Sequence, residues 1–559
     1  MPTADTSAPL STRSGTRTRF RLSTAVLIRS AIALVSGAVL YLAFPPRTLW
    51  WLAPIAFLGL CAVIWGRKAR AGFGYGLVFA SVWQLLLLKW LDDFLSVRFG
   101  IGPWLALSLI CALLIAVAVA AMAAVSKLPL APLWMAMIFV AGEALRARFP
   151  LNGFPWSELA YSQADGVLLP LVSIGGTALL GFTVVLLGAA AAALVWRGRP
   201  RPGIRPRRSD IPAGIMLITP LLAGGLLLPS LNAGATDGGL RVAVVQGNAP
   251  NVGIDLLAEG DTIWANHQAG LERLLRDIRT GAQPQPDLVL LPESSARLHP
   301  GGNTAAQLAD YADRLGAPLL SGALAYGADG SVRNTVVAVE PGAGQVASYA
   351  KQELVPFSEY IPFRNIAGWF TPFLDRDTDM TPGTEPGLVR TAGTELGLAI
   401  CYEIAYDAIP AEAVEAGAKL LLVPTNNAWF GDTEMSYQQL AMSRVRAVEH
   451  DRAVINAATS GVSAFVRPDG SVASQTELYT ATTLAADVPL RSQVTLSDRL
   501  GKAPELALTG GGLLALGGVL GGWLRTRWHA RRTSDQHDRG QDDESNTGTR
   551  SARRRGGQE

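Results

Sequence analysis

The sequence predicts a multi-span α-helical membrane domain joined to an α/β domain. The first 230 residues hold seven long apolar stretches, and an eighth lies near the C-terminus. Charged residues make up 17% of the chain, whereas about 25% is usual in soluble proteins. Between the seventh and eighth stretches, short apolar runs alternate with amphipathic segments, which is typical of an α/β domain.

Each of the eight apolar stretches is close to the length needed to cross a bilayer, about 20 mostly apolar residues. They cover residues 26–44, 48–66, 71–91, 103–125, 132–148, 167–196, 211–228 and 507–524. The chain is therefore expected to have a basic N-terminus, a seven-helix transmembrane domain, an α/β catalytic domain, an eighth transmembrane helix and a disordered charged tail. The corresponding limits are 1–25, 26–230, 238–495, 505–525 and 526–559.

Lys and Arg residues predict the orientation of the spans, because they accumulate in cytoplasmic loops. Basic residues precede the first span and follow the second, fourth, sixth and eighth spans. The loop after the fifth span departs mildly from this pattern, since it carries Arg146 and Arg148. Both termini are thus expected in the cytoplasm, and the α/β domain is expected outside it.

Composition excludes several classes of function. The formal net charge of +3 is small for this length and does not indicate a nucleic-acid partner. Of the three cysteines, Cys61 and Cys111 lie inside apolar stretches, and only Cys401 lies in the α/β domain. We find no disulfide framework, no metal-ligand spacing and no phosphate-binding loop, so no metal or cofactor is expected.

The α/β domain should alternate strands with helices. The expected strands are 241–246, 287–293, 319–323, 334–340, 346–351, 396–400, 419–424, 452–456 and 462–467, the last forming a hairpin across Pro468-Asp-Gly470. The expected helices are 256–280, 303–315, 407–416 and 436–450.

Three chemically useful side chains each follow an apolar strand: Glu293, Lys351 and Cys401. Strand ends of one sense meet at one edge of an α/β sheet, so these groups are expected to lie together there. A carboxylate, an ammonium and a thiol form a workable acyl-transfer set. Each also has a structural interpretation: a helix N-terminal charge, a surface cation and a small buried hydrophobe.

The motifs around these residues resemble a known family. Leu291-Pro-Glu-Ser294, Lys351-Gln-Glu-Leu-Val-Pro-Phe-Ser-Glu359 and Ile400-Cys-Tyr-Glu403 resemble the three catalytic motifs of the nitrilase (carbon–nitrogen hydrolase) superfamily. Together with eight spans, they are similar to the apolipoprotein N-acyltransferase family. The resemblance implies that the α/β domain is a nitrilase-like αββα sandwich.

The resemblance also implies roles for individual residues. Glu293 would be the general base, Lys351 the oxyanion-stabilising residue and Cys401 the nucleophile. Glu359, Tyr402 and Glu403 match supporting active-site positions, and Trp429, Phe430 and Trp156 are candidate substrate-binding residues, with packing as the alternative role. Apolar residues 366–374 are a candidate lid or acyl-chain wall.

The family would take an acyl chain from a membrane phospholipid as a thioester and pass it to the N-terminal amine of a diacylglyceryl-cysteine on an apolipoprotein. A monomer in the bacterial plasma membrane, without cofactors, is expected. One alternative is a membrane-anchored amidase or nitrilase that uses the same three residues with water, although a single helix would suffice to anchor it. The other alternative is a non-catalytic transporter or scaffold, which the three filled catalytic positions disfavour.

Overall fold

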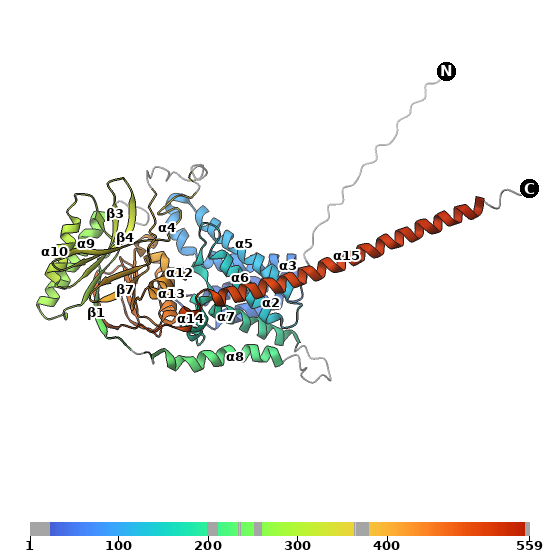
Figure 1. The fold of residues 1–559 in the computed structure, drawn as a ribbon, viewed down its shortest axis with the longest axis horizontal. Coiled ribbons are helices and arrows are strands. Elements are labelled where there is room, and N and C mark those ends of the chain that lie inside the picture. The colour runs from blue at the N-terminus through green and yellow to red at the C-terminus, as the bar shows by residue number, and fades with distance from the viewer. Residues whose placement is uncertain are drawn as a thin grey trace, which may run out of the picture.

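The computed structural model describes residues 23–197, 211–232, 234, 236–250, 260–362, 364 and 379–553, of which 94, 97–99, 197, 232 and 529–553 are described by backbone alone. Figure 1 shows an α/β part at the left and a bundle of helices to its right. Helices α12 (Ala408–Glu415) and α13 (Met435–His450) lie between the two parts.

All eight predicted spans contain a helix. These are α1 (Thr24–Leu42), α2 (Leu52–Ile64), α3 (Ala69–Leu87), α5 (Gly102–Val125), α6 (Ala131–Arg146), α7 (Val172–Arg197), α8 (Ile211–Leu227) and α15 (Ala503–Arg553). Within the described chain, five helical segments, in the regions of α1, α5, α7, α8 and α15, are long and apolar enough to cross a membrane on their own. The number of spans therefore stays a prediction.

One helix in this region was not expected from the sequence. The predicted third span runs to residue 91, but α3 ends at Leu87, and Leu88 leaves the helical conformation with φ −98° and ψ 16°. A separate helix, α4 (Lys89–Phe99), begins immediately afterwards. Its polar and charged residues distinguish it from the apolar helix before it.

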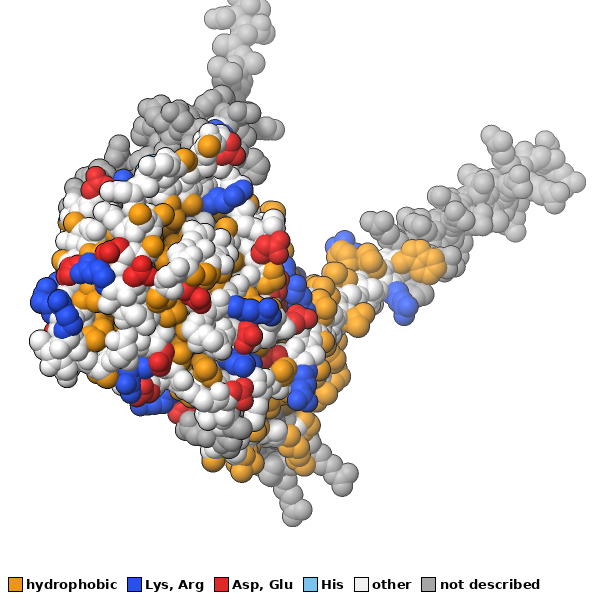
Figure 2. All heavy atoms as spheres, turned by 60° about the vertical axis from the view of Figure 1, so that its left-hand side comes forward, with side chains coloured by type: hydrophobic (Ala, Val, Ile, Leu, Met, Phe, Trp, Pro, Cys, Tyr) orange, Lys and Arg blue, Asp and Glu red, His pale blue; other side chains and the backbone are white. Residues whose placement is uncertain are grey.

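Large apolar side chains are exposed mainly on the helices of the bundle. Examples are Ile28 and Val35 on α1, Leu222 and Leu226 on α8, and Leu514 on α15, which are 55%, 56%, 60%, 79% and 79% exposed. Figure 2 shows such side chains gathered along α15, whereas charged side chains are spread over the α/β face. Contiguous exposed apolar surface of this kind suits contact with lipid.

The C-terminal segment differs from the prediction. A disordered tail is expected over 526–559, but α15 continues as a helix to Arg553. Once a helix exists, each further residue adds a hydrogen bond without a new nucleation cost, so the apolar segment can propagate a helix into a polar sequence.

The α/β part contains two six-stranded sheets. The first has the order β12 (Thr482–Pro489), β1 (Gly239–Gln246), β2 (Leu288–Leu298), β3 (Leu319–Tyr326), β4 (Val332–Glu340) and β5 (Gly344–Ala350). The second has the order β11 (Val472–Gln475), β10 (Ala464–Val466), β9 (Val454–Ala458), β8 (Leu420–Thr425), β7 (Thr394–Leu398) and β6 (Leu388–Thr391). In each sheet, three central parallel strands are flanked by antiparallel ones.

Successive side chains along each strand point to opposite faces of the sheet, and this alternation shows how the layers are stacked. In β2, Leu288 and Leu290 pack toward the second sheet, while Val289 and Leu291 pack under α9 (Gly260–Arg279) and α10 (Thr304–Leu315). This is the period of two that a strand imposes on its side chains. In β8, Leu420 and Leu422 face the first sheet, while Leu421 and Val423 face α12 and α13. The order of layers is thus helix, sheet, sheet, helix.

Candidate active site

Cys401 lies at a strained turn just after a buried strand. Strand β7 ends at Leu398, and Cys401 opens a short 3-10 segment, Cys401–Ala405. Its φ is +53°, a conformation that non-glycine residues adopt at a cost of about 1–3 kcal/mol and that is concentrated at functional sites. The turn places the thiol beyond the strand, where a nucleophile can meet a substrate.

The sequence predicts that Glu293 follows a strand. In the structure, Glu293 instead lies within β2. The pairing of β2 with β3 shifts register between Leu291 and Ala296, and Ser294 has φ +55°. This irregularity interrupts the ladder at the carboxylate, which is 5% exposed. The prediction ended the strand at Glu293 because a polar, bulged segment cannot be distinguished from a strand end by periodicity.

Lys351 follows β5 directly, as predicted, and is 1% exposed. Its Nζ lies 3.2 Å from Glu293 Oε1 and 3.0 Å from Glu359 Oε1. Asn334 Nδ2 donates to the same two oxygen atoms, each at 2.7 Å. Two carboxylates are therefore held around one ammonium and one amide in a buried network.

The site lies between the two sheets, not at the edge of one. Glu293 and Lys351 belong to the first sheet, and Cys401 follows β7 of the second. The second sheet also contacts Glu293 directly. The backbone N–H of Asn426, just after β8, donates to Glu293 Oε2 at 2.8 Å. The three predicted residues are thus brought together by facing sheets, a different geometry from the expected single edge.

The Cys401 thiol lies within hydrogen-bonding reach of the Glu293 carboxylate. Burial and the negative charge of Glu293 raise the pKa of Cys401 to about 12, although Lys351 and a hydrogen bond with Thr425 act in the opposite direction. At neutral pH the thiol is therefore protonated. Gln439 Nε2 lies 3.8 Å from the sulfur and can donate to a thiolate.

Lys351 keeps its charge in spite of its burial. Desolvation alone would lower its pKa, but Glu293 and Glu359 outweigh it and hold the pKa well above its ordinary value. A buried, permanently protonated ammonium beside a thiol is suited to stabilise negative charge that develops on a substrate oxygen.

Glu403 joins the cysteine turn to the segment after Lys351. Its carboxylate accepts from the backbone N–H of Ile400 at 2.7 Å and of Gln352 at 2.7 Å, and from the Tyr349 hydroxyl at 2.9 Å. Complete burial raises the pKa of Glu403 to about 7, against the effect of Lys351 and the backbone donors. This carboxylate therefore ties the residue before Cys401 to the segment after Lys351.

Comparison with known proteins agrees with this geometry. Residues 36–190 match the family model of the apolipoprotein N-acyltransferase N-terminal domain, and residues 241–495 match that of carbon–nitrogen hydrolase. An apolipoprotein N-acyltransferase of Mycolicibacterium smegmatis is 35% identical over 87% of this chain and 84% of its own length. This chain belongs to the apolipoprotein N-acyltransferase family.

Other relatives agree with this assignment to the apolipoprotein N-acyltransferases. The enzyme of that name from Azotobacter vinelandii is 31% identical over 90% of this chain and 96% of its own length. Among solved structures, Saccharomyces cerevisiae Nit3, a member of the nitrilase superfamily, covers 45% of this chain and 91% of its own, with 17% identity and a TM-score of 0.35.

In this apolipoprotein N-acyltransferase family member, aromatic rings connect the turn at Cys401 to the helix bundle. Tyr402 stacks on Trp156 and Phe154 from the loop after α6, with ring centroids 6.1 and 6.2 Å apart. Trp156 also lies 5.4 Å from Trp90 of α4, which contacts Phe430 edge-on at 5.1 Å. Trp156, Tyr402 and Phe430 thus share one cluster beside Cys401.

Two other predicted substrate-contacting features are Trp429 and the candidate lid. Trp429 is half-buried and packs against Ala249 and Ile263. The candidate lid at 366–374 lies outside the described residues.

Asn334, Gln439 and Thr425 were missed by sequence reasoning. Asn334 is the third residue of β4, and its position beside Lys351 follows from the antiparallel pairing of β4 with β5. Gln439 is fully buried on α13, and its Oε1 lies 3.1 Å from the Thr425 hydroxyl. Helix α13 buries several other polar side chains, among them Gln438, Ser443 and Arg446, so no pattern in the sequence distinguishes Gln439 from them.

Proposed function

We propose that this protein transfers a fatty acyl chain from a membrane phospholipid to the N-terminal amine of a diacylglyceryl-cysteine on lipoproteins. The family assignment supports an N-acyltransferase, and its relatives are named for apolipoproteins. The observation that carries the mechanism is the buried arrangement of Lys351 between Glu293 and Glu359, beside the strained Cys401.

In the proposed first half-reaction, Glu293 removes the thiol proton, and the Cys401 sulfur attacks the ester carbonyl of the phospholipid. Lys351 stabilises the negative charge on the carbonyl oxygen. The carbon–oxygen ester bond then breaks, and the leaving alkoxide takes the proton from Glu293. The products are a Cys401 thioester and a lysophospholipid.

In the second half-reaction, the lipoprotein amine attacks the thioester carbonyl, which is reactive toward amines. Glu293 accepts the proton that the amine loses and returns it to the departing Cys401 thiolate. An amide bond forms, a thioester bond breaks, and the enzyme returns to its initial protonation state. Glu359 and Glu403 act as positioning residues, because they hold Lys351 and the cysteine turn.

The proposed topology places residues 238–495 outside the cytoplasm, with both termini inside. The distribution of Lys and Arg supports it, as does the exposed apolar surface of the helix bundle. The proposed domain limits are those of the sequence analysis, except that the tail is helical to Arg553. We propose that the active protein is a monomer.

The test is to incubate the purified full-length protein in detergent micelles with an acyl-labelled phospholipid. We expect a fatty acyl thioester on Cys401 that persists in buffer and clears, with formation of an amide, when a diacylated lipopeptide is added. Clearance by water alone would identify a hydrolase instead, and the absence of an adduct would exclude covalent transfer.

A further inference from the structure

One buried arginine takes no part in the proposed reaction but contacts the turn that carries the nucleophile. Arg446 of α13 is fully buried. Its Nε donates to the carbonyl oxygen of Ile404 at 3.2 Å, and its Nη2 donates to that of Ala405 at 3.1 Å. These are the last two residues of the cysteine turn, Cys401–Ala405. Carbonyl groups at the end of a helical turn have no acceptor role within it, so a buried end needs donors from elsewhere.

A tyrosine from the helix bundle holds the same end of the turn. Tyr161 is buried and lies in a short 3-10 segment, Leu159–Gln163, between α6 and α7. Its hydroxyl donates to Ala405 O at 2.8 Å and accepts from Arg446 Nη2 at 3.1 Å. Arg446 and Tyr161 therefore form one bridge at the end of the cysteine turn, with one member from α13 and one from the bundle.

Acidic groups hold the guanidinium in this position. Arg446 Nη1 lies 2.5 Å from Glu449 Oε2, and its Nη2 lies 2.6 Å from Asp407 Oδ1. Asp407 also accepts from the Thr177 hydroxyl of α7 at 3.1 Å. Burial alone would lower the pKa of Arg446, but Tyr161, Asp407 and Glu449 outweigh burial and hold the pKa well above its ordinary value. The charged form is therefore the one that bridges the turn.

This bridge lies at the opposite end of the turn from the Glu403 contact. Glu403 accepts from the backbone N–H of Ile400, the residue before Cys401, at 2.7 Å. Cys401 has φ +53°, and a residue stays in such a conformation only where the surrounding structure holds it there. Contacts at both ends of a five-residue turn supply such a constraint. With the carbonyl end released, Cys401 would be free to relax and to carry its sulfur away from Glu293.

We propose that Arg446 is a positioning residue for Cys401, and that it acts together with the Tyr161 hydroxyl by holding the carbonyl end of the cysteine turn. This assignment rests on the proposed function. Arg446 acts through the backbone and needs no contact with a substrate. Because Tyr161 belongs to the helix bundle, the bundle contributes to the alignment of the nucleophile as well as to contact with lipid.

The test compares two conservative variants of the full-length protein in single-turnover acylation by a labelled phospholipid. Tyr161→Phe removes the hydroxyl but keeps the ring, and Arg446→Lys keeps the charge but cannot donate to both carbonyl oxygen atoms from a planar group. Each should lower the rate constant of acyl-enzyme formation about tenfold, the effect of one hydrogen bond. The half-saturating phospholipid concentration and the fraction of protein that becomes acylated should not change, because loss of folded protein lowers that fraction and not the rate constant.

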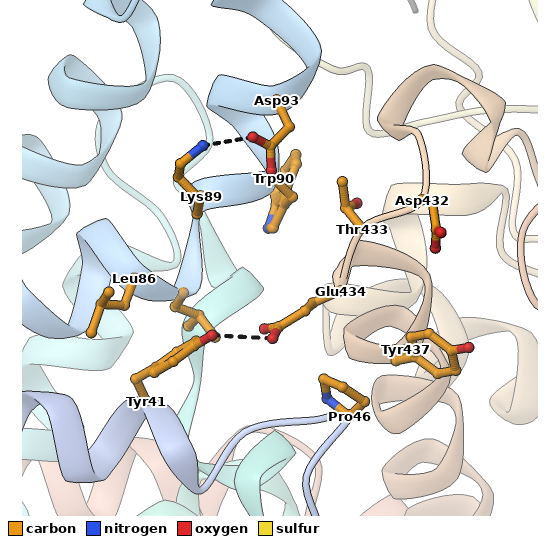
Figure 3. A pocket seen from close by; sticks show the side chains of 11 residues that line it. Tyr41, Pro46, Leu86, Lys89, Trp90, Asp93, Asp432, Thr433, Glu434 and Tyr437 are labelled. Carbon is orange, nitrogen blue, oxygen red and sulfur yellow. Dashed lines mark hydrogen bonds and ion pairs between the residues drawn. The ribbon is translucent and has the colours of Figure 1, made fainter. Parts of the chain in front are cut away.

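Two residues provide matched controls. Arg444 lies on the same helix and donates to Gly470 O at 2.7 Å and Ala164 O at 3.0 Å, which lie outside the cysteine turn. Tyr41 of the bundle donates to Glu434, just before α13, at 3.1 Å, as Figure 3 shows. Arg444→Lys and Tyr41→Phe should both acylate at the wild-type rate.

An unchanged rate constant in Tyr161→Phe or in folded Arg446→Lys would overturn the proposal. If Arg446→Lys does not fold, Tyr161→Phe decides alone. An equal loss in Arg444→Lys or Tyr41→Phe would also overturn it, because the docking of α13 would then be the cause. A smaller acylated fraction with an unchanged rate constant would show a structural role only, and a raised half-saturating concentration with an unchanged maximal rate would show a role in substrate binding.

Alkylation of Cys401 by iodoacetamide, measured by mass spectrometry, separates this proposal from the proposed reaction. The sulfur forms a bond to the methylene carbon, iodide leaves, and the thiol proton passes to Glu293. Misalignment in Tyr161→Phe should slow this step about tenfold, while Cys61 and Cys111, both buried in the bundle, stay unmodified and report that the fold is intact. Unchanged or faster alkylation of Cys401 would overturn the positioning role.

The two proposals can fail separately. If the wild-type protein forms no acyl adduct, but alkylation of Cys401 is slower in Tyr161→Phe and Arg446→Lys, the transfer mechanism fails and the positioning role stands. If the adduct forms and both variants form it at the wild-type rate, the transfer mechanism stands and the positioning role fails.

Discussion

Replacement of Lys351 by Met tests the electrostatic basis of the proposed reaction. The change removes the ammonium that lies 3.2 Å from Glu293 and 3.0 Å from Glu359, while a side chain of similar length remains. If Lys351 stabilises the oxyanion, its loss should slow acyl-enzyme formation by about 10²–10³-fold, equivalent to about 2.7–4 kcal/mol of activation free energy. A single-turnover assay of labelled acyl chain on Cys401 measures this rate.

The same replacement should also destabilise the protein. Removing one member of a buried ion pair typically costs about 3–5 kcal/mol, because the partner charges stay buried. Glu293 and Glu359 would then share only the Asn334 amide, at 2.7 Å from each. Thermal unfolding and the acylation rate should therefore be measured on the same preparation, below the unfolding temperature.

Lys419→Ala is the matched control for this experiment. The Lys419 side chain is 33% exposed and lies 3.7 Å from Glu395, a surface pair worth about 0–1 kcal/mol. It should acylate at the wild-type rate. Acylation by Lys351→Met within threefold of wild type, or an equal loss in Lys419→Ala, would refute the oxyanion assignment.

Three further predictions concern neighbouring groups. Cys401→Ala and Cys401→Ser should each lower transfer by about 10⁴-fold or more without altering the fold measured by circular dichroism, and near-normal turnover in either would reject covalent catalysis. Acyl-enzyme formation should rise as pH increases through about 7, because Glu403, with its pKa near 7, holds the cysteine turn as an ionised acceptor. Glu403→Gln should abolish this inflection, and its persistence would assign it to another group. Gln439→Leu should slow acylation about tenfold through loss of a donor to the thiolate, while the exposed Gln345→Leu should not, and equal rates would show that Gln439 only packs.

Local patterns in the sequence predicted the elements that carry the site. The apolar runs before Lys351 and Cys401 form β5 and β7, and helical periodicity near 436–450 corresponds to α13. These elements were predictable because their burial follows a period of two or 3.6 residues. The charged tail was predicted to be disordered because of its composition. Composition alone does not show that a helix can extend into the tail from the apolar segment that precedes it.

Relationships between distant residues were not predictable in this way. The contact of Asn426 N–H with Glu293 joins residues on opposite sheets, and no local pattern encodes how two sheets face each other. Strand β12 was not predicted, although it pairs with β1 over eight positions. Its partly exposed sequence, Thr482–Pro489, has no strong alternation. Asn334 and Gln439 became visible as site residues only through tertiary packing.

The three consecutive residues Cys401, Tyr402 and Glu403 connect three different parts of the molecule. Cys401 presents the sulfur to Glu293, Tyr402 stacks on rings from the helix bundle, and Glu403 accepts from the segment after Lys351. Since the 3-10 geometry directs successive side chains about 120° apart, one short turn can reach all three directions. Tyr402 therefore links the helix bundle directly to the turn that carries the sulfur.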